Sequence, residues 1–268
     1  MRLLESWARV LGEFNQTIDQ IRFDAILRGM SLDDSRTARA AADWSAVLSG
    51  EADDTRSALI RAGIDLFGRR GFDGASTREI ARAAQVNIAG IAYHFGGKAG
   101  LHRACGEAIA HFVRGVVGEV PVTAEGVEAL DPGVATEVFL AAVAGIARFM
   151  LGRPEAESIA RFMVREQMDP SETFAVLYET LIRPRHEAMC RLFARATGED
   201  AASEAVIIAV SAMFGQIMFF RVGRATALAR LGWEVIDPPR LDAILAAVTT
   251  SIRATVAARR AALGEIRP

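Results

Sequence analysis

Residues 77–98 read TREIARAAQVNIAGIAYHFGGK, and this short stretch decides the fold of the region around it. Thr77 stands where the N-cap of a short amphipathic helix belongs. Gln85 and Val86 form a tight connection, and Asn87 is a good N-cap for a second short helix, which Gly96 and Gly97 end. Two short helices joined by a tight turn are typical of a helix-turn-helix.

A longer helix is expected before these two. Apolar residues recur at helical spacing over residues 54–71, and Gly71 fits a C-terminal glycine, with a loop over residues 72–76. In a helix-turn-helix the first of the two short helices braces the second, whose N-terminal side chains enter the major groove. The spacing therefore predicts a three-helix DNA-binding unit.

Charge is distributed unevenly along the chain. The 268 residues carry a formal net charge of −2, but residues 54–103 contain eight Lys and Arg against four acids, a net charge of +4 for that segment. A basic segment in an acidic chain is expected of a part that binds phosphates, although many solvated helical faces carry the same surplus.

The stretch also resembles the DNA-binding domain of the TetR family. The resemblance covers about 50 residues and rests on residues 60–67, 71–72, 75–81, 84–87 and 93–95 with Lys98 and Leu101. Ala92 departs from it, because family members usually carry a tyrosine there. The string of residues 87–98, together with residues 165–170, Tyr178 and residues 182–184, looks instead like the CecR-like branch of that family.

The resemblance implies a set of residues that contact DNA: Thr77, Arg78, Asn87, Ile88, Ala89, Gly90, Tyr93, His94 and Lys98.

Within this set, Ile88, Ala89 and Gly90 are expected to face the bases, where small apolar residues favour thymine methyls and close backbone approach. Base specificity then depends on Asn87, Tyr93 and DNA shape.

Tyr93, His94 and Lys98 are the expected contacts to backbone phosphates, although a local helix cap stays open for His94. Thr77 offers its hydroxyl and helix amides to a phosphate, or serves only as a cap. Arg78 is either a phosphate contact or a solvated charge.

Helix is predicted for almost all of the chain after Lys98. Proline and glycine mark the breaks between the expected segments, and Pro184 should kink or split the fourth of them. The segments are residues 98–118, 134–151, 155–168, 172–197, 202–230 and 240–263. The fold class is all-α, with a helix-turn-helix domain over residues 51–101 and a helical effector-binding and dimerisation domain over residues 102–268.

In the family the C-terminal helices bind a small-molecule effector and form a homodimer. The wide apolar faces around residues 202–220 and 241–256 predict pairing with a second copy. Polar residues in apolar helices are candidates to orient an effector, although salt bridges and ordinary core packing remain the alternatives. These candidates are Arg161, Arg165, Glu166, Tyr178, Arg183, His186 and Gln216.

Other classes of function find little support. The two cysteines, Cys105 and Cys190, form no disulfide framework, which favours the cytoplasm, and the apolar run over residues 205–220 is expected to be a buried helix rather than a membrane span. The four histidines lack metal-ligand spacing, and no nucleophile elbow or phosphate loop occurs. We therefore expect no enzyme, no cofactor and no metal.

Residues 1–50 form an N-terminal extension. A heptad-like stripe from Leu4 to Ala25 predicts an amphipathic helix, but Met30 is an alternative start, so residues 1–29 are either a genuine helix or an artefact. The leading hypothesis is a ligand-responsive repressor that binds a pseudo-palindromic operator in double-stranded DNA as a homodimer. The alternatives are a helical dimer that acts through a protein partner docked on this stripe, and a sensor whose DNA binding is lost.

Overall fold

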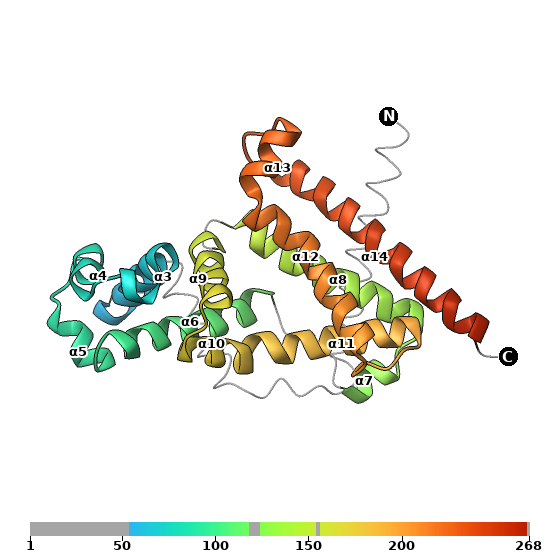
Figure 1. The fold of residues 1–268 in the computed structure, drawn as a ribbon, viewed down its shortest axis with the longest axis horizontal. Helices are drawn as coiled ribbons and strands as arrows, with labels where there is room; N and C mark the ends of the chain where they lie inside the picture. The colour runs from blue at the N-terminus through green and yellow to red at the C-terminus, as the bar shows by residue number, and fades with distance from the viewer. Residues whose placement is uncertain (1–53, 118–123, 154–155, 267–268) are drawn as a thin grey trace. The chain divides into compact units, whose positions relative to one another are not determined.

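The computed structural model describes residues 54–117, 124–153 and 156–266, and every element in these ranges is helical, as the sequence predicts. The expected N-terminal stripe and linker lie outside the described residues. Labels follow Figure 1, in which the first described helices are α3 (Thr55–Gly74), α4 (Thr77–Ala83), α5 (Ala89–Phe95) and α6 (Lys98–Val117).

The first helix, α3, begins at its N-cap Asp54, whose carboxylate accepts a hydrogen bond from the backbone N–H of Ser57 at 2.8 Å. Gly71 interrupts the helix with a φ of 75°, a conformation that favours glycine, and one further turn continues to Gly74. The predicted helix end at Gly71 is therefore a kink. The inward face of α3, with Leu59, Ile64 and Phe67, is buried.

The remaining elements follow α6 in chain order: α7 (Ala124–Glu128), α8 (Pro132–Gly152), α9 (Ala156–Met168), α10 (Glu172–Leu177), the π-helical turn η1 (Tyr178–Ile182), α11 (Arg183–Thr197), α12 (Glu204–Val222), α13 (Arg224–Leu231) and α14 (Pro238–Ile266).

Two breaks differ from the expected segments. Residues 172–197 are split as predicted, because Pro184 stands in the first turn of α11 and the π-helical turn precedes it. Residues 202–230 are split by Gly223, which the sequence analysis placed inside one helix. The short helix α7 was not predicted either, since five residues are too few for a periodic signal.

Helix α9 packs along α3 (Figure 1). A Cβ atom at Gly68 would lie 3.0 Å from the backbone nitrogen of Phe162, so the two backbones are in direct contact at this point. The rings of Phe67 and Phe162 meet edge to face, with centroids 6.5 Å apart. The first described helix is thus fixed to the C-terminal helices through α9.

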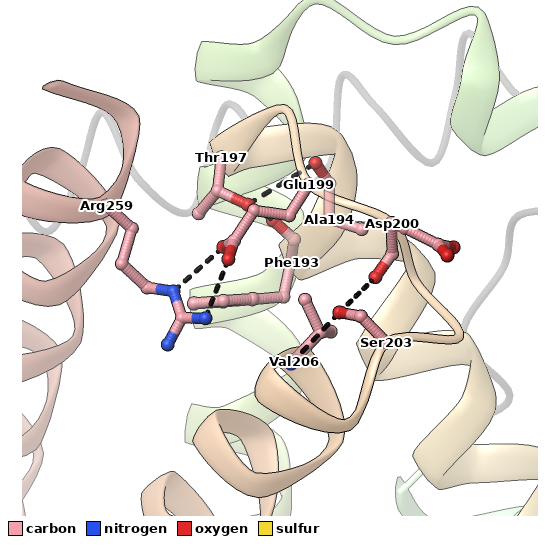
Figure 2. Close-up of polar contacts among 8 residues, drawn as sticks. All are labelled: Phe193, Ala194, Thr197, Glu199, Asp200, Ser203, Val206 and Arg259. Carbon is pink, nitrogen blue, oxygen red and sulfur yellow. Dashed lines mark hydrogen bonds and ion pairs between the residues drawn. The ribbon is translucent and has the colours of Figure 1, made fainter. Parts of the chain in front are cut away.

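A polar cluster fixes the loop between α11 and α12 to α14 (Figure 2). The guanidinium of Arg259 donates two hydrogen bonds to the carboxylate of Glu199, at 2.8 and 2.6 Å. In the same loop the hydroxyl of Ser203 donates to the carbonyl of Asp200 at 2.7 Å and accepts from the N–H of Val206 at 3.3 Å, which caps α12.

Within the part of the chain that the structure describes, three helices are long and apolar enough to cross a membrane by length and composition alone: Pro132–Gly152, Glu204–Val222 and Pro238–Leu263. The apolar window of the first is 61% buried within the protein, but those of the second and third are only 28% and 33% buried. The expectation that residues 205–220 form a buried helix is therefore wrong for this single chain. α12 and α14 leave much of their apolar surface uncovered.

Candidate nucleic-acid interface

The start of α4 is capped by Ser76 rather than by Thr77. The Ser76 hydroxyl accepts a hydrogen bond from the N–H of Glu79 at 3.2 Å, and the Glu79 carboxylate accepts from the N–H of Ser76 at 3.3 Å. This reciprocal pair is a capping box, and the sequence analysis placed the cap one residue too late. Thr77 is the first residue of the helix and is half-buried, while Arg78 is exposed.

Glu79 also joins α4 to α3. Its carboxylate accepts hydrogen bonds from the Ser76 hydroxyl at 2.8 Å and from the guanidinium of Arg70 at 2.5 Å. These bonds, the one from Ser76 first, lower the pKa of Glu79 to about 2. The charge of Arg70 is therefore paired within the protein and is not available as a free cation.

The turn between α4 and α5 depends on two polar residues. Gln85 adopts a φ of 58°, the one left-handed non-glycine conformation among the residues described, and the N–H of Val86 donates to the carbonyl of Ala81 at 3.0 Å. The side chain of Asn87 accepts a hydrogen bond from the N–H of Ala89 at 2.9 Å. The N-cap position of α5 is Ile88 rather than Asn87, and Asn87, one residue earlier, bonds the first N–H of the helix with its side-chain oxygen.

The outer face of α5 is open to solvent. Ile91 is buried and anchors the helix to the domain core, whereas Ile88, Ala89 and His94 are exposed and the Tyr93 side chain is 85% exposed. The rings of Tyr93 and His94 meet edge to face with centroids 4.9 Å apart. A tyrosine with so much exposed surface and no partner in its own core is a candidate contact for another molecule.

Gly90 lies differently from its two neighbours. A Cβ atom there would approach Thr55 and Leu59 of α3, at 3.4 and 3.5 Å, so this position of α5 points into the domain. The absent side chain lets α5 lie close to α3 here, and contact of the Gly90 backbone with bases stays a prediction.

Lys98 and Gly100 form the junction between α5 and α6. The Lys98 ammonium lies 4.6 Å from the ring centroid of Phe72 and 3.5 Å from the carbonyl oxygen of Asp73. A Cβ atom at Gly100 would lie 1.8 Å from the carbonyl oxygen of Phe95, so only glycine allows this close approach of the two helices.

The seven effector candidates do not form one site. Arg161 and Arg165 line adjoining pockets, together with Arg221. Tyr178 is partly exposed and stacks on Phe174, and Arg183 is exposed and paired with Glu179.

The last of the candidates lie near α12. The His186 ring lies 3.1 Å from the Ser211 hydroxyl, and burial lowers the pKa of His186. Gln216 is half-buried on α12.

Glu166 belongs to a buried polar network that the sequence analysis did not foresee. Its carboxylate accepts from the Ser171 hydroxyl at 2.7 Å and lies 3.5 Å from Nε2 of His102, whose Nδ1 lies 2.8 Å from the Thr173 hydroxyl. Burial, and then the charge of Lys98, lower the pKa of His102 to about 4. His102 is therefore neutral at pH 7, and the network is held by hydrogen bonds rather than by an ion pair.

In the ranges that the structure covers, no group of three or more His, Cys, Asp or Glu side chains could hold a metal ion. The polar residues described above offer hydrogen bonds, one exposed aromatic face and positive charge. This chemistry suits the recognition of another molecule.

Two protein families match the chain. Residues 59–105 match the family described as bacterial regulatory proteins, tetR family, and residues 135–259 match the family described as HTH-type transcriptional dual regulator CecR, C-terminal domain. The two matches cover the helix-turn-helix and most of the helices from α8 to α14.

Among characterised relatives, the HTH-type transcriptional dual regulator CecR of Shigella flexneri is 34% identical over 203 residues, which are 75% of this chain and 90% of the relative. The HTH-type transcriptional regulatory protein RaaS of Mycobacterium tuberculosis is 48% identical over 64 residues, 24% of this chain and 30% of the relative.

Solved structures share the fold at lower identity. A transcriptional regulator from Rhodococcus sp. Rha1 is similar with a TM-score of 0.52 and 16% identity, over 74% of this chain and 96% of that one. A member of the TetR transcriptional regulator family from Streptomyces coelicolor A3 is similar with a TM-score of 0.50 and 19% identity, over 72% and 88%.

Proposed function

Because the chain belongs to the TetR family of bacterial transcriptional regulators and carries a C-terminal domain of the CecR type, we propose that it is a ligand-responsive repressor in the cytoplasm. It binds a pseudo-palindromic operator as a homodimer. Residues 51–101 form the DNA-binding domain, and residues 102–268 form the effector-binding and dimerisation domain.

The observation that carries the DNA-binding part is the open outer face of α5, next to the exposed start of α4. Ile88 and Ala89 at the start of α5 face the bases, and Tyr93 and His94 at its end contact the backbone. Thr77 and Arg78 at the start of α4 meet a phosphate.

Two further residues act with this face. The side chain of Asn87 bonds the first N–H of α5 and so fixes the start of that helix. Lys98 adds positive charge after the end of α5. Because the Lys98 ammonium also lies over Phe72, its contact with DNA requires a turn of the side chain away from that ring.

The dimer part of the proposal rests on α12 and α14. Ile208 and Phe219 are 58% and 52% exposed, and both lie on one side of α12. On α14, exposed residues that recur at helical spacing along one side are small, among them Ala247, Ala254 and Ala257. A second copy can therefore approach this side of the helix closely. A four-helix interface between two copies would cover this surface and leave both α5 helices free.

Repression and its relief follow from that arrangement. A two-fold dimer places two recognition helices on successive major grooves, about 34 Å apart. An effector that changes this separation weakens operator binding, since both helices no longer fit at once. The Shigella flexneri relative is named a dual regulator, so the regulated genes should be scored for activation as well as repression.

The test is to sequence genomic fragments that the purified full-length protein retains at near-physiological salt. The control is the Tyr93→Ala/His94→Ala double variant, in which both substitutions remove exposed side chains and leave the buried anchor Ile91 in place. We expect enrichment of a pseudo-palindromic site that the variant loses. Equal enrichment by both proteins would refute the assignment of α5 as the recognition helix.

A further inference from the structure

An arginine cluster lies where four helices of the C-terminal half converge. Arg153 follows the end of α8, Arg161 belongs to α9, Arg221 stands in the last turn of α12, and Arg224 begins α13. These side chains line one pocket of about 310 Å³. Glu157 also lines the pocket and pairs with Arg161. The pocket therefore holds four positive charges and one negative charge.

Arg221 is the residue of this cluster whose burial lowers the stability of the fold. Its Nη2 atom is buried and has no hydrogen-bond partner within the described protein. Burial, together with the charges of Arg224 and Arg161, lowers the pKa of Arg221. Among the described residues, no carboxylate forms an ion pair with Arg153, Arg221 or Arg224. An unpaired guanidinium N–H destabilises a fold unless something else satisfies it.

We propose that this pocket binds a small polyanion, whose phosphate or carboxylate oxygens accept hydrogen bonds from Arg221 and Arg224. The guanidinium group suits this task, because its planar set of N–H donors matches the oxygens of both anions. The assignment of this pocket as the effector site rests on the function proposed above. It adds that the effector is a small polyanion.

The position of the pocket also connects it to the DNA-binding half. Arg161 and Arg221 line a second pocket of about 410 Å³, and Gly68 of α3 lines that one too. Since a Cβ at Gly68 would lie only 3.0 Å from the backbone of Phe162, α3 and α9 cannot slide freely over each other. An anion that draws Arg161 towards Arg221 moves α9, and α3 has to follow.

The binding test uses isothermal titration calorimetry on the full-length protein without DNA. The probes are inorganic pyrophosphate and citrate, titrated separately at constant ionic strength, so that phosphate and carboxylate chemistry are distinguished. We expect saturable binding of at least one probe with a Kd below about 1 mM. Absence of binding of both probes up to about 10 mM would overturn the proposal.

Three variants locate the binding. Arg221→Gln/Arg224→Gln should weaken it at least about tenfold, whereas Arg230→Gln, which removes an exposed arginine from α13 outside both pockets, should leave it unchanged. Arg221→Met should abolish tight binding and raise the midpoint of thermal unfolding by about 2–4 °C, because the buried unpaired N–H is gone. Equal losses in Arg230→Gln, or a less stable Arg221→Met, would contradict the proposal.

Two further measurements separate this site from other roles. Sedimentation of the double variant should match that of the wild type; loss of a dimer would assign the arginines to the subunit interface instead. Binding of a probe without any retained DNA would refute the proposed regulator and leave the anion site standing. Retention of a selected DNA site without binding of either probe would refute the anion site and leave the proposed regulator standing. If both bind, we expect the bound probe to lower the affinity for the selected DNA at least about threefold.

Discussion

The DNA-binding half and the half that we propose to bind the effector (the effector half) carry their polar residues in opposite ways. In the first half the exposed residues Arg78, Ile88, Ala89, Tyr93 and His94 are close in sequence, on two short helices. In the second half Arg153 from the end of α8, Arg161 from α9 and Arg221 from α12 meet in a pocket. The first arrangement suits a large partner, and the second suits the small anion that we propose.

The two halves also differ in which side chain is left without a partner inside the protein. The DNA-binding half leaves an aromatic ring, Tyr93, almost fully exposed, while its charged pair Arg70 and Glu79 is satisfied. The effector half leaves Arg221 partly buried and without a partner for one N–H. In each half the unsatisfied group marks the surface that we assign to a ligand.

The largest single effect expected in the DNA-binding half comes from Gly100→Ala. The added Cβ would overlap the carbonyl oxygen of Phe95, so we expect a loss of about 3 kcal/mol in unfolding free energy and loss of operator binding. Denaturant titration measures it. Gly145→Ala is the matched control, because no atom lies within 4 Å of its new Cβ, and it should be neutral or slightly stabilising. Equal behaviour of the two variants would refute the close approach.

In the effector half, Ile208→Asp should have the next largest effect. A carboxylate on the exposed apolar side of α12 should raise the dissociation constant of the dimer about 100-fold, because the charge would be buried against a second copy. Analytical ultracentrifugation measures it. Val134→Asp, at an exposed position near the start of α8, is the control and should leave the dimer intact. A dimer that tolerates Ile208→Asp would place the interface elsewhere.

A smaller effect is expected at the loop between α11 and α12. Hydrogen bonds from Arg259 lower the pKa of Glu199 below its ordinary value of 4.5. A lowered carboxylate pKa stabilises the fold above the unfolded pKa, and that contribution is lost as the pH falls through the lower, folded value. Glu199→Gln should therefore cost about 1 kcal/mol at pH 7 and nothing once both states are protonated.

The check for Glu199 is denaturant unfolding at several pH values between about 2 and 7. Glu128→Gln, an exposed carboxylate on α7, serves as the control and should show no such pH dependence. A cost for Glu199→Gln that stays constant across this range would contradict the ion pair as its cause.

The smallest effect sharpens the role of Lys98. If its ammonium turns to a phosphate, Lys98→Ala should reduce the slope of log affinity against log salt by about 1, with little change in base preference. If it stays over the Phe72 ring, the slope is unchanged and only stability falls. Fluorescence anisotropy at several salt concentrations distinguishes the two results.

Most of the fold of the DNA-binding half is predictable from the sequence, because its signals are local. The tight turn at Gln85, the side-chain bond of Asn87 to the start of α5 and the glycines after Phe95 each act within a few residues. The wrong predictions there are also local. The cap of α4 is Ser76 instead of Thr77; both residue types cap helices and the two stand side by side, although serine is the better cap.

The effector half was predictable as helices but not as a site. The apolar periodicity gave the helices, and Pro184 gave a break, yet nothing in the sequence places Arg153, Arg221 and Arg224 together. Only Arg161 and Arg165 of the predicted effector candidates lie at the arginine cluster or its neighbouring pocket. Whether distant residues meet depends on how the helices pack against one another. That packing leaves no local pattern in a single sequence.

The most direct test of the account is a hydroxyl-radical footprint of the full-length protein on a selected genomic site. We predict two protected patches related by the pseudo-two-fold axis, on successive major grooves about one helical turn apart, both lost in the Tyr93→Ala/His94→Ala variant. A single patch, or protection that the variant retains, would contradict a dimer that reads DNA with its two α5 helices.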